Sequence, residues 1–160
     1  MSAIAERLHA VAHRAAMAGR DLDDSWPSPL ETTLAATTLL KHGQAYREDA
    51  ERAINRALRW WQDEMSSETS GDAAALALLA RACHETQRTN TGLTAAAVAA
   101  VEKLTHQPMQ SLPVLHLFLA AWGLSELVPD RHSSFWTRLN DQVARASKLG
   151  VDQPLATLTL

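Results

Sequence analysis

The chain has 160 residues with 46% hydrophobic and 21% charged content, which favours one globular domain over a disordered chain. We expect that domain over residues 1–150, followed by a C-terminal tail over 151–160. A formal net charge of −3 and the lack of a Lys/Arg block exclude an electrostatic nucleic-acid binder. A single cysteine excludes an internal disulfide, and no apolar run is long enough for a membrane span. The sequence therefore predicts a cytoplasmic protein without nucleic-acid partners.

Hydrophobic residues at helical spacing predict about seven helices, and the first two lie before residue 43. The first is expected over 2–18. The second begins at "SPLE", Ser28 to Glu31, and runs to about His42. Serine at the cap, proline at the first helical position and glutamate at the third form a capping box. Such a cap stabilises a helix by about 1 kcal/mol.

The remaining five predicted helices differ in how apolar they are. Those over 46–65, 93–106 and 132–149 each have one apolar face and one polar face, so we expect them to be half-buried. The helix over 72–88, which Asp72 is expected to open, contains an unbroken apolar run. The helix over 112–127 is also apolar nearly all round. An all-round apolar helix is expected to be buried.

Apolar and amphipathic helices alternate at a regular spacing along the chain. The apolar helices begin near Leu30, Gly71 and Pro113, which are 41 and then 42 residues apart. This period predicts an all-α fold of three stacked α-hairpins, either a partial α/α toroid or a layer of helical repeats. An irregular helical bundle with accidental spacing is the alternative.

The stretch over 26–65 contains "WPSPLETTLAATTLLKHG", an acidic turn and then "AINRALRWW". The stretch begins with a tryptophan-containing loop. An inner helix of small residues follows, and then a charged outer helix that ends in aromatic residues. This order resembles one repeat of the α/α-toroid proteins, in particular the squalene–hopene cyclases and related class II terpene cyclases. The segment Asp21-Leu22-Asp23-Asp24, just before it, matches the Asp-x-Asp-Asp acid motif of that family.

The resemblance implies an enzyme that protonates an isoprenoid double bond, with Asp23 as the proton donor and Asp21 and Asp24 beside it. Neighbouring carboxylates can hold one member of such a group protonated. Two prolines follow the acids here, whereas in the family the motif opens directly into a helix. Solvated acids in a loop or at a helix end are the alternative interpretation.

Further candidate site residues lie on the apolar helices. Glu31 is interpreted as a helix cap or as a carboxylate near a cavity. The side chains of Thr33 and Thr37 are expected to line a ligand pocket or to bond the preceding helical turn. Candidate ligand-binding residues are Trp26, Thr33, Thr37, His116 and Trp122.

Neither a metal site nor a cofactor is expected. Glu6, His9 and His13 share one helix face, and the two histidines have the i, i+4 spacing of metal ligands. No second segment offers an obvious further ligand, however. Cys83 and His84 are neighbours on a helix and point about 100° apart, so we expect Cys83 to be a small core residue.

Besides a helix-bundle regulator that binds a ligand, two functions follow from these patterns. The first is an accessory or binding helical-repeat protein that presents its apolar inner helices to a small apolar ligand or a partner chain. Stacked hairpins expose apolar ends unless these are capped, so we expect a homo-oligomer or a partner protein. The second is a terpene-cyclase-like enzyme, or half-domain, that uses Asp21, Asp23, Asp24 and Glu31.

Overall fold

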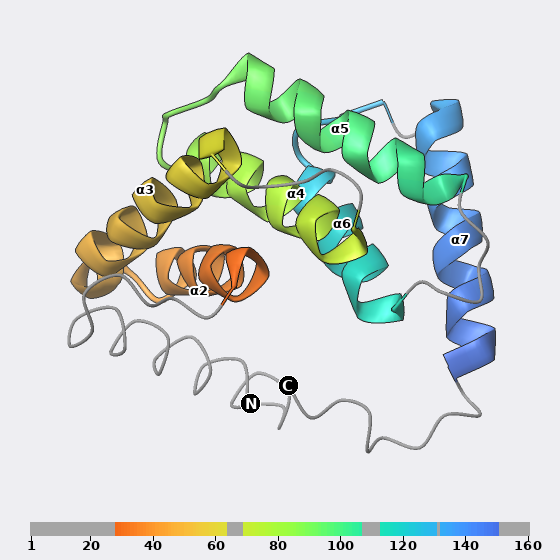
Figure 1. The fold of residues 1–160 in the computed structure, drawn as a ribbon, viewed down its shortest axis with the longest axis horizontal. Coiled ribbons are helices and arrows are strands. Elements are labelled where there is room, and N and C mark those ends of the chain that lie inside the picture. Colours follow the sequence, from red (N-terminus) through yellow and green to blue (C-terminus); the bar gives the residue numbers. More distant parts are fainter. Residues whose placement is uncertain (1–27, 64–68, 107–112, 131, 151–160) are drawn as a thin grey trace.

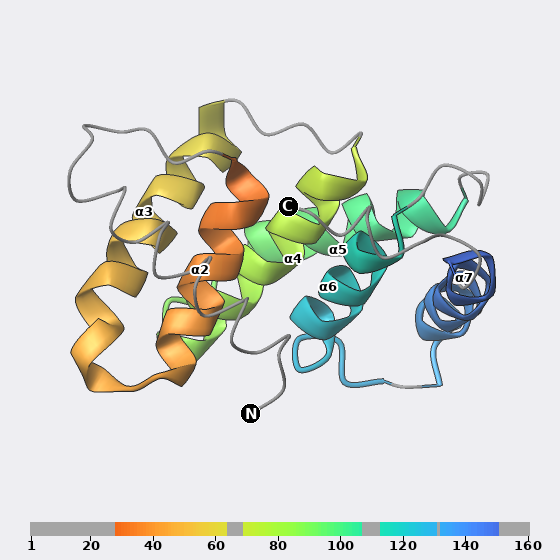
Figure 2. The same cartoon turned by 90° about the horizontal axis from the view of Figure 1, so that it is seen from below.

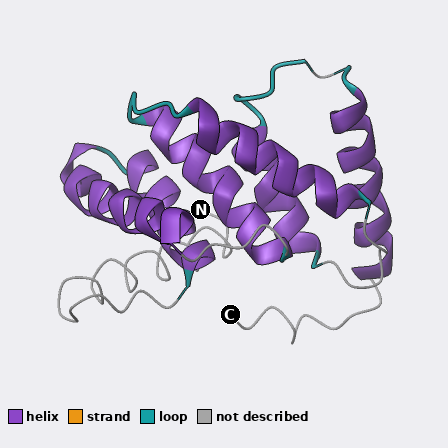
Figure 3. Cartoon of the chain, turned by 45° about the horizontal axis from the view of Figure 1, so that its top comes forward, coloured by secondary structure: helices purple, strands orange, loops and turns teal. Residues whose placement is uncertain are grey.

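The computed structural model describes residues 28–63, 69–106, 113–130 and 132–150, with side chains to residue 145. These residues form α-helices, one short 3-10 helix and loops, and no strand occurs among them (Figure 1, Figure 3). The all-α prediction is therefore confirmed for the described part of the chain. The helices predicted after residue 27 are all present there, whereas the predicted helix over 2–18 and the tail over 151–160 lie outside it. The elements are α2 (Pro29–Lys41), η1 (Gln44–Tyr46), α3 (Arg47–Asp63), α4 (Ser70–Glu85), α5 (Thr91–Thr105), α6 (Val114–Leu124) and α7 (Ser134–Gly150).

Helix α4 lies at the centre of the fold. It packs against α2 on one side and α6 on the other, and it also contacts α3 and α5. Figure 2 shows α2, α4 and α6 side by side. Every residue from Ala73 to Cys83 is buried, as the unbroken apolar run predicts.

The other three helices pack outside this row. Helix α3 contacts α2, α5 contacts α4, and α7 contacts both α5 and α6. The buried face of α3 comprises Ala50, Ala53, Ile54 and Ala57, while Leu58 and Trp61 are half-buried. This is the predicted apolar face, and the rest of α3 carries the charges.

Helices α4 and α6 run in the same direction, because contacts join their starts and their ends separately. Ser70 in the first turn of α4 bonds His116 in the first turn of α6. Arg81 in the last two turns of α4 bonds the carbonyl of Trp122 near the end of α6. Lys41, the last residue of α2, lies over the same Trp122 ring, so the end of α2 is at this side too.

Small residues bring α4 and α6 close together. A methyl group placed on Gly123 of α6 would lie 2.6 Å from the carbonyl carbon of Ala77 and 2.9 Å from its Cβ. Real Cβ atoms do not approach this closely, so only glycine fits at position 123. The alanines of α4 contribute to the same effect, since they hold no long side chain between the two backbones.

Two predicted boundaries of α4 are wrong by a few residues. Its cap is Thr69 rather than Asp72: the Thr69 hydroxyl accepts the Asp72 N–H at 3.1 Å, which puts Asp72 in the first turn. The helix ends at Glu85 rather than at residue 88. Gln87 takes a left-handed φ of 58°, and the N–H groups of Gln87 and Arg88 bond back to His84 and Cys83, which is a Schellman termination.

Helix α6 is also shorter than predicted. It ends at Leu124, not near residue 127, because the chain tightens into turns there. The Ser125 N–H bonds the Trp122 carbonyl at 3.3 Å, and the Leu127 N–H bonds the Leu124 carbonyl at 3.1 Å. Hydrogen bonds of this 3-10 type, between residues three positions apart, often close the last turn of a helix.

Candidate functional site

The predicted acid cluster lies outside the described residues. This holds for Asp21, Asp23 and Asp24, for Trp26, and for the histidine pair predicted near the N-terminus, His9 and His13. Their roles therefore remain predictions. Within the part of the chain that the structure describes, no group of three or more His, Cys, Asp or Glu side chains could hold a metal ion.

Glu31 lies in the first turn of α2, as predicted. Its backbone N–H donates to the Ser28 hydroxyl oxygen at 3.2 Å, and Pro29 is the first helical residue. The serine half of the capping box is thus confirmed. The carboxylate is half-buried and lies where the helix dipole favours a negative charge.

Thr33 and Thr37 are fully buried on α2. The Thr33 hydroxyl donates to the carbonyls of Pro29 and Leu30 at 3.0 and 3.1 Å. The Thr37 hydroxyl bonds the carbonyls of Thr33 and Leu34, both at 3.0 Å. These contacts match the second of the two interpretations above, in which threonine bonds the preceding helical turn.

His116 is half-buried and pairs with Ser70 across the α4–α6 contact. The distance from its Nδ1 to the Ser70 hydroxyl oxygen is 2.8 Å. Burial lowers the pKa of His116 below its usual value, because desolvation penalises the charged imidazolium. The hydrogen bond therefore joins the first turns of α4 and α6.

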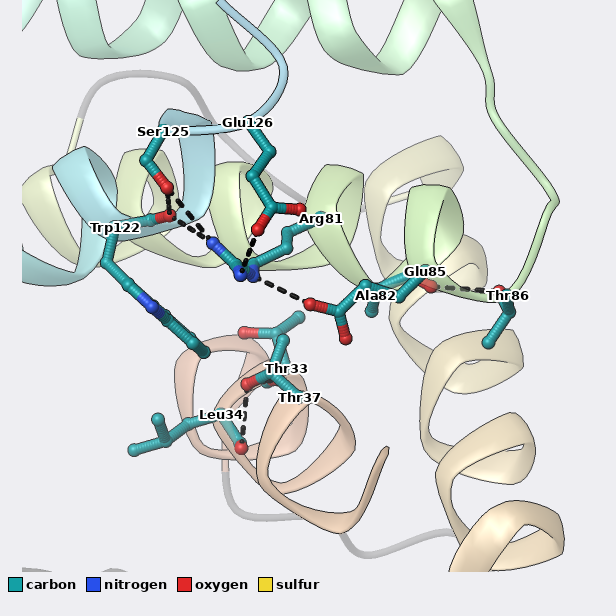
Figure 4. Close-up of polar contacts among 10 residues, drawn as sticks. All are labelled: Thr33, Leu34, Thr37, Arg81, Ala82, Glu85, Thr86, Trp122, Ser125 and Glu126. Carbon is teal, nitrogen blue, oxygen red and sulfur yellow. Dashed lines mark hydrogen bonds and ion pairs between the residues drawn. The ribbon is translucent and has the colours of Figure 1, made fainter. Parts of the chain in front are cut away.

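Arg81 forms the largest polar cluster of the described core, and sequence reasoning missed it. Its guanidinium donates to the Trp122 carbonyl at 2.7 Å and the Ser125 hydroxyl at 3.1 Å. It also pairs with Glu85 at 2.8 Å and Glu126 at 3.1 Å (Figure 4). The Trp122 carbonyl, among the last of α6, also accepts from the Ser125 N–H at 3.3 Å and the Ser125 hydroxyl at 2.8 Å. Arg81 adds a donor from α4 and so joins α4 to the end of α6.

Trp122 lies between two cations. The Lys41 ammonium is 4.3 Å from the centre of its ring, and the Arg81 guanidinium carbon is also 4.3 Å away. Cation–π contacts at this distance stabilise the folded chain by about 0.5–2 kcal/mol. Trp122 therefore connects the ends of α2, α4 and α6, and its half-buried ring reaches the surface.

The outer face of α6 is an apolar stripe formed by Leu115, Phe118, Leu119 and Trp122. These positions follow the i, i+3, i+4, i+7 pattern and so share one side of the helix. Phe118 is 54% exposed and is the one large hydrophobic residue classed as exposed in the described part of the chain. The α6 stripe was not predicted as such, although the all-apolar sequence of this helix with a flanking proline was its visible signal.

Cys83 behaves as a core residue, as predicted. It is buried, and burial raises the pKa of its thiol while the nearby Arg88 lowers it to a smaller extent. A raised pKa leaves less thiolate at neutral pH, which makes Cys83 a poor nucleophile.

Comparison with known proteins identified no matching family model, no matching curated protein and no matching solved structure. The resemblance to class II terpene cyclases therefore rests on the sequence of residues 21–65 and stays a prediction. None of the helices that the structure describes combines the length and the apolar composition of a membrane span.

Proposed function

We propose that this protein is a helical-repeat binding module that associates with a second copy of itself through the α6 stripe. Its repeats are three α-hairpins, namely α2 with α3, α4 with α5, and α6 with α7. The observation that carries the proposal is the incomplete burial of α6, the most apolar of the described helices.

The hairpin arrangement is supported by the helix contacts. Each helix of the central row contacts the helix that follows it in sequence, and α2, α4 and α6 contact one another in order through α4. A one-dimensional stack of this kind leaves each end of the row with one neighbour. Helix α4 has neighbours on both sides and is buried, whereas α6 is at the end of the row and is not.

The composition of α6 supports a binding role for its outer face. His116 is its single polar side chain, yet four of its eleven residues are buried, namely Leu117, Ala120, Gly123 and Leu124. A helix that is apolar all round is usually buried on all sides. The face bearing Phe118 therefore has the composition of a buried surface, yet Phe118 stays 54% exposed.

A second copy of the chain suits this face better than a small molecule. Small ligands bind in concave sites, whereas the α6 stripe is defined by residues along one side of a single helix. Two copies of one helix can pack apolar face to apolar face around a twofold axis, which makes the contact self-complementary. Phe118 and Trp122 would lie at its centre, where aromatic residues contribute most to binding.

Sedimentation equilibrium of the full chain tests this proposal. We expect a dimer mass for the wild type at a chain concentration of about 100 µM, where weak self-association is detectable. We expect a monomer mass for Phe118→Asp at the same concentration. Thr137→Asp, at an exposed site on α7, is the matched control and should sediment like the wild type. A wild-type chain that is monomeric under these conditions contradicts the proposal, as does a dimer that Phe118→Asp leaves intact.

A further inference from the structure

The Ser70–His116 pair joins two helices at the opposite end from Arg81. These residues are 46 positions apart in sequence, yet the Ser70 hydroxyl oxygen lies 2.8 Å from His116 Nδ1. Both side chains are half-buried, so neither is sealed in the core. Ser70 is the first residue of α4 and His116 is the third residue of α6.

We propose that Ser70 and His116 form a nucleophile–base pair that hydrolyses esters of apolar carboxylic acids. A serine hydroxyl is a weak nucleophile unless a base lies within about 2.6–3.2 Å to take its proton, and His116 meets that distance. This activity goes beyond the proposed binding function and does not depend on it.

The protonation state of His116 suits a general base. Burial lowers its pKa, so the imidazole is neutral at pH 7. In the tautomer that carries its proton on Nε2, Nδ1 accepts the hydrogen bond from Ser70. The ring can then receive the hydroxyl proton as the oxygen attacks.

The start of α4 supplies donors for the charge that develops on the substrate. The first N–H groups of a helix have no acceptor within the helix. Thr69 accepts the N–H groups of Asp72 and Ala73, both at 3.1 Å, and the N–H groups of Ser70 and Gly71 precede these two in the first turn. The N–H directly after a nucleophile is a common oxyanion donor, and Gly71 adds no side chain there.

Neighbouring residues on α6 set the class of substrate. Leu119 follows His116 by three positions, so the two side chains lie on adjoining parts of the helix surface. Leu119 is half-buried, so an acyl group next to His116 would contact an apolar side chain.

The reaction proceeds in two balanced steps. The Ser70 oxygen bonds to the acyl carbon while its proton passes to His116 Nδ1, and the carbon–oxygen bond to the alcohol breaks as that alcohol takes the proton from His116. Water then attacks the acyl-serine and gives a proton to His116, which returns it to the Ser70 oxygen as the acid leaves. The overall reaction consumes one ester and one water and needs no oxidant or reductant.

The experiment is labelling of the folded chain with an alkyl fluorophosphonate, followed by intact mass and peptide mapping. We expect a single adduct on Ser70, none in Ser70→Ala, and a labelling rate at least about 100-fold lower in His116→Gln, the usual contribution of a general base. Ser134→Ala removes a serine at the first position of α7 and should label like the wild type. Turnover of p-nitrophenyl butyrate should follow the same order.

Several results would overturn the inference: no adduct on the wild type, an adduct on another residue, or a rate that His116→Gln does not change. Circular dichroism checks that each variant is helical. If Ser70→Ala fails to fold, the mapped site on the wild type decides. Because Leu119 also belongs to the α6 stripe, the labelling is repeated on Phe118→Asp, which should form the same adduct on Ser70 whatever its sedimentation shows.

Discussion

Arg81 is charged and buried, with 6% of its surface exposed. A guanidinium can remain in such a place only if its N–H groups find acceptors. Those acceptors come from its own helix at Glu85 and from the end of α6 at Trp122, Ser125 and Glu126. Its role is therefore to hold the ends of α4 and α6 together.

Replacing Arg81 should destabilise the chain substantially. Arg81→Met leaves Glu85 and Glu126 without their cation and removes the donor from α4 to the Trp122 carbonyl, so we expect a loss of about 2–3 kcal/mol in the free energy of unfolding. Arg47→Met is the control, because the Arg47–Glu51 pair is 44% exposed on both sides and contributes about 0.3–0.5 kcal/mol. Equal losses in urea unfolding of the two variants would contradict this account.

Burial of His116 beside Ser70 predicts that the free energy of unfolding depends on pH. The folded-state pKa of His116 lies below the usual 6.5, so the unfolded chain binds the proton more readily. The contribution of neutral His116 is complete above pH 6.5 and is lost as the pH falls through 6.5 toward the lower folded-state pKa.

The difference in unfolding free energy between the wild type and His116→Gln isolates this effect. We expect that difference to favour the wild type more at pH 7.5 than at pH 5.5, since glutamine does not titrate. Urea unfolding at several pH values measures it. A difference that is constant with pH, or larger at pH 5.5, is incompatible with a lowered pKa.

At the scale of helices, the contact between α4 and α6 depends on small residues. Gly123→Ala should cost about 1–3 kcal/mol in the free energy of unfolding, because the new methyl group would overlap the backbone of Ala77. Helix propensity alone predicts the opposite sign, a gain of about 1 kcal/mol.

Gly71→Ala is the matched control for this prediction. Gly71 is also helical, but a methyl group there would meet its nearest atom, His116 Cε1, at an ordinary 3.6 Å. We expect it to be neutral or stabilising in thermal unfolding. A Gly123→Ala variant as stable as Gly71→Ala would show that α4 and α6 are further apart than described.

The hydrophobic periodicity of the sequence was sufficient to predict the described helices but not the contacts between them. The unbroken run from Ala73 to Ala80 predicts a helix buried on every side, and α4 is one. The sequence shows nothing unusual at Arg81 or at Gly123, because their roles depend on residues more than 40 positions away. The cap of α4 was misplaced for a local reason: Thr69 and Asp72 are both good cap residues.

For the candidate site, the sequence indicated residues one at a time. It named His116 and Trp122 but not Ser70 or Lys41, their partners from α4 and α2. Pairing across helices depends on how α4 and α6 align, which no local pattern encodes. The threonines of α2 were left with two interpretations, and burial of α2 against α4 accounts for the one observed.

At the scale of the whole molecule, the fold has one helix in the centre of a row and apolar helices at its ends. Helix α4 is covered by α2, α3, α5 and α6, whereas α6 keeps Phe118 54% exposed. A surface of this composition is typical of a site for another protein surface. We propose that a second copy of α6 covers it.

Disulfide trapping tests that claim most directly. In a Cys83→Ala background, Phe118→Cys places a thiol at the centre of the α6 stripe, and a twofold contact brings it beside its own copy. The account predicts rapid formation of a covalent dimer under mild oxidation, with Thr137→Cys on exposed α7 reacting far more slowly. Equal rates of dimer formation from positions 118 and 137 would contradict it.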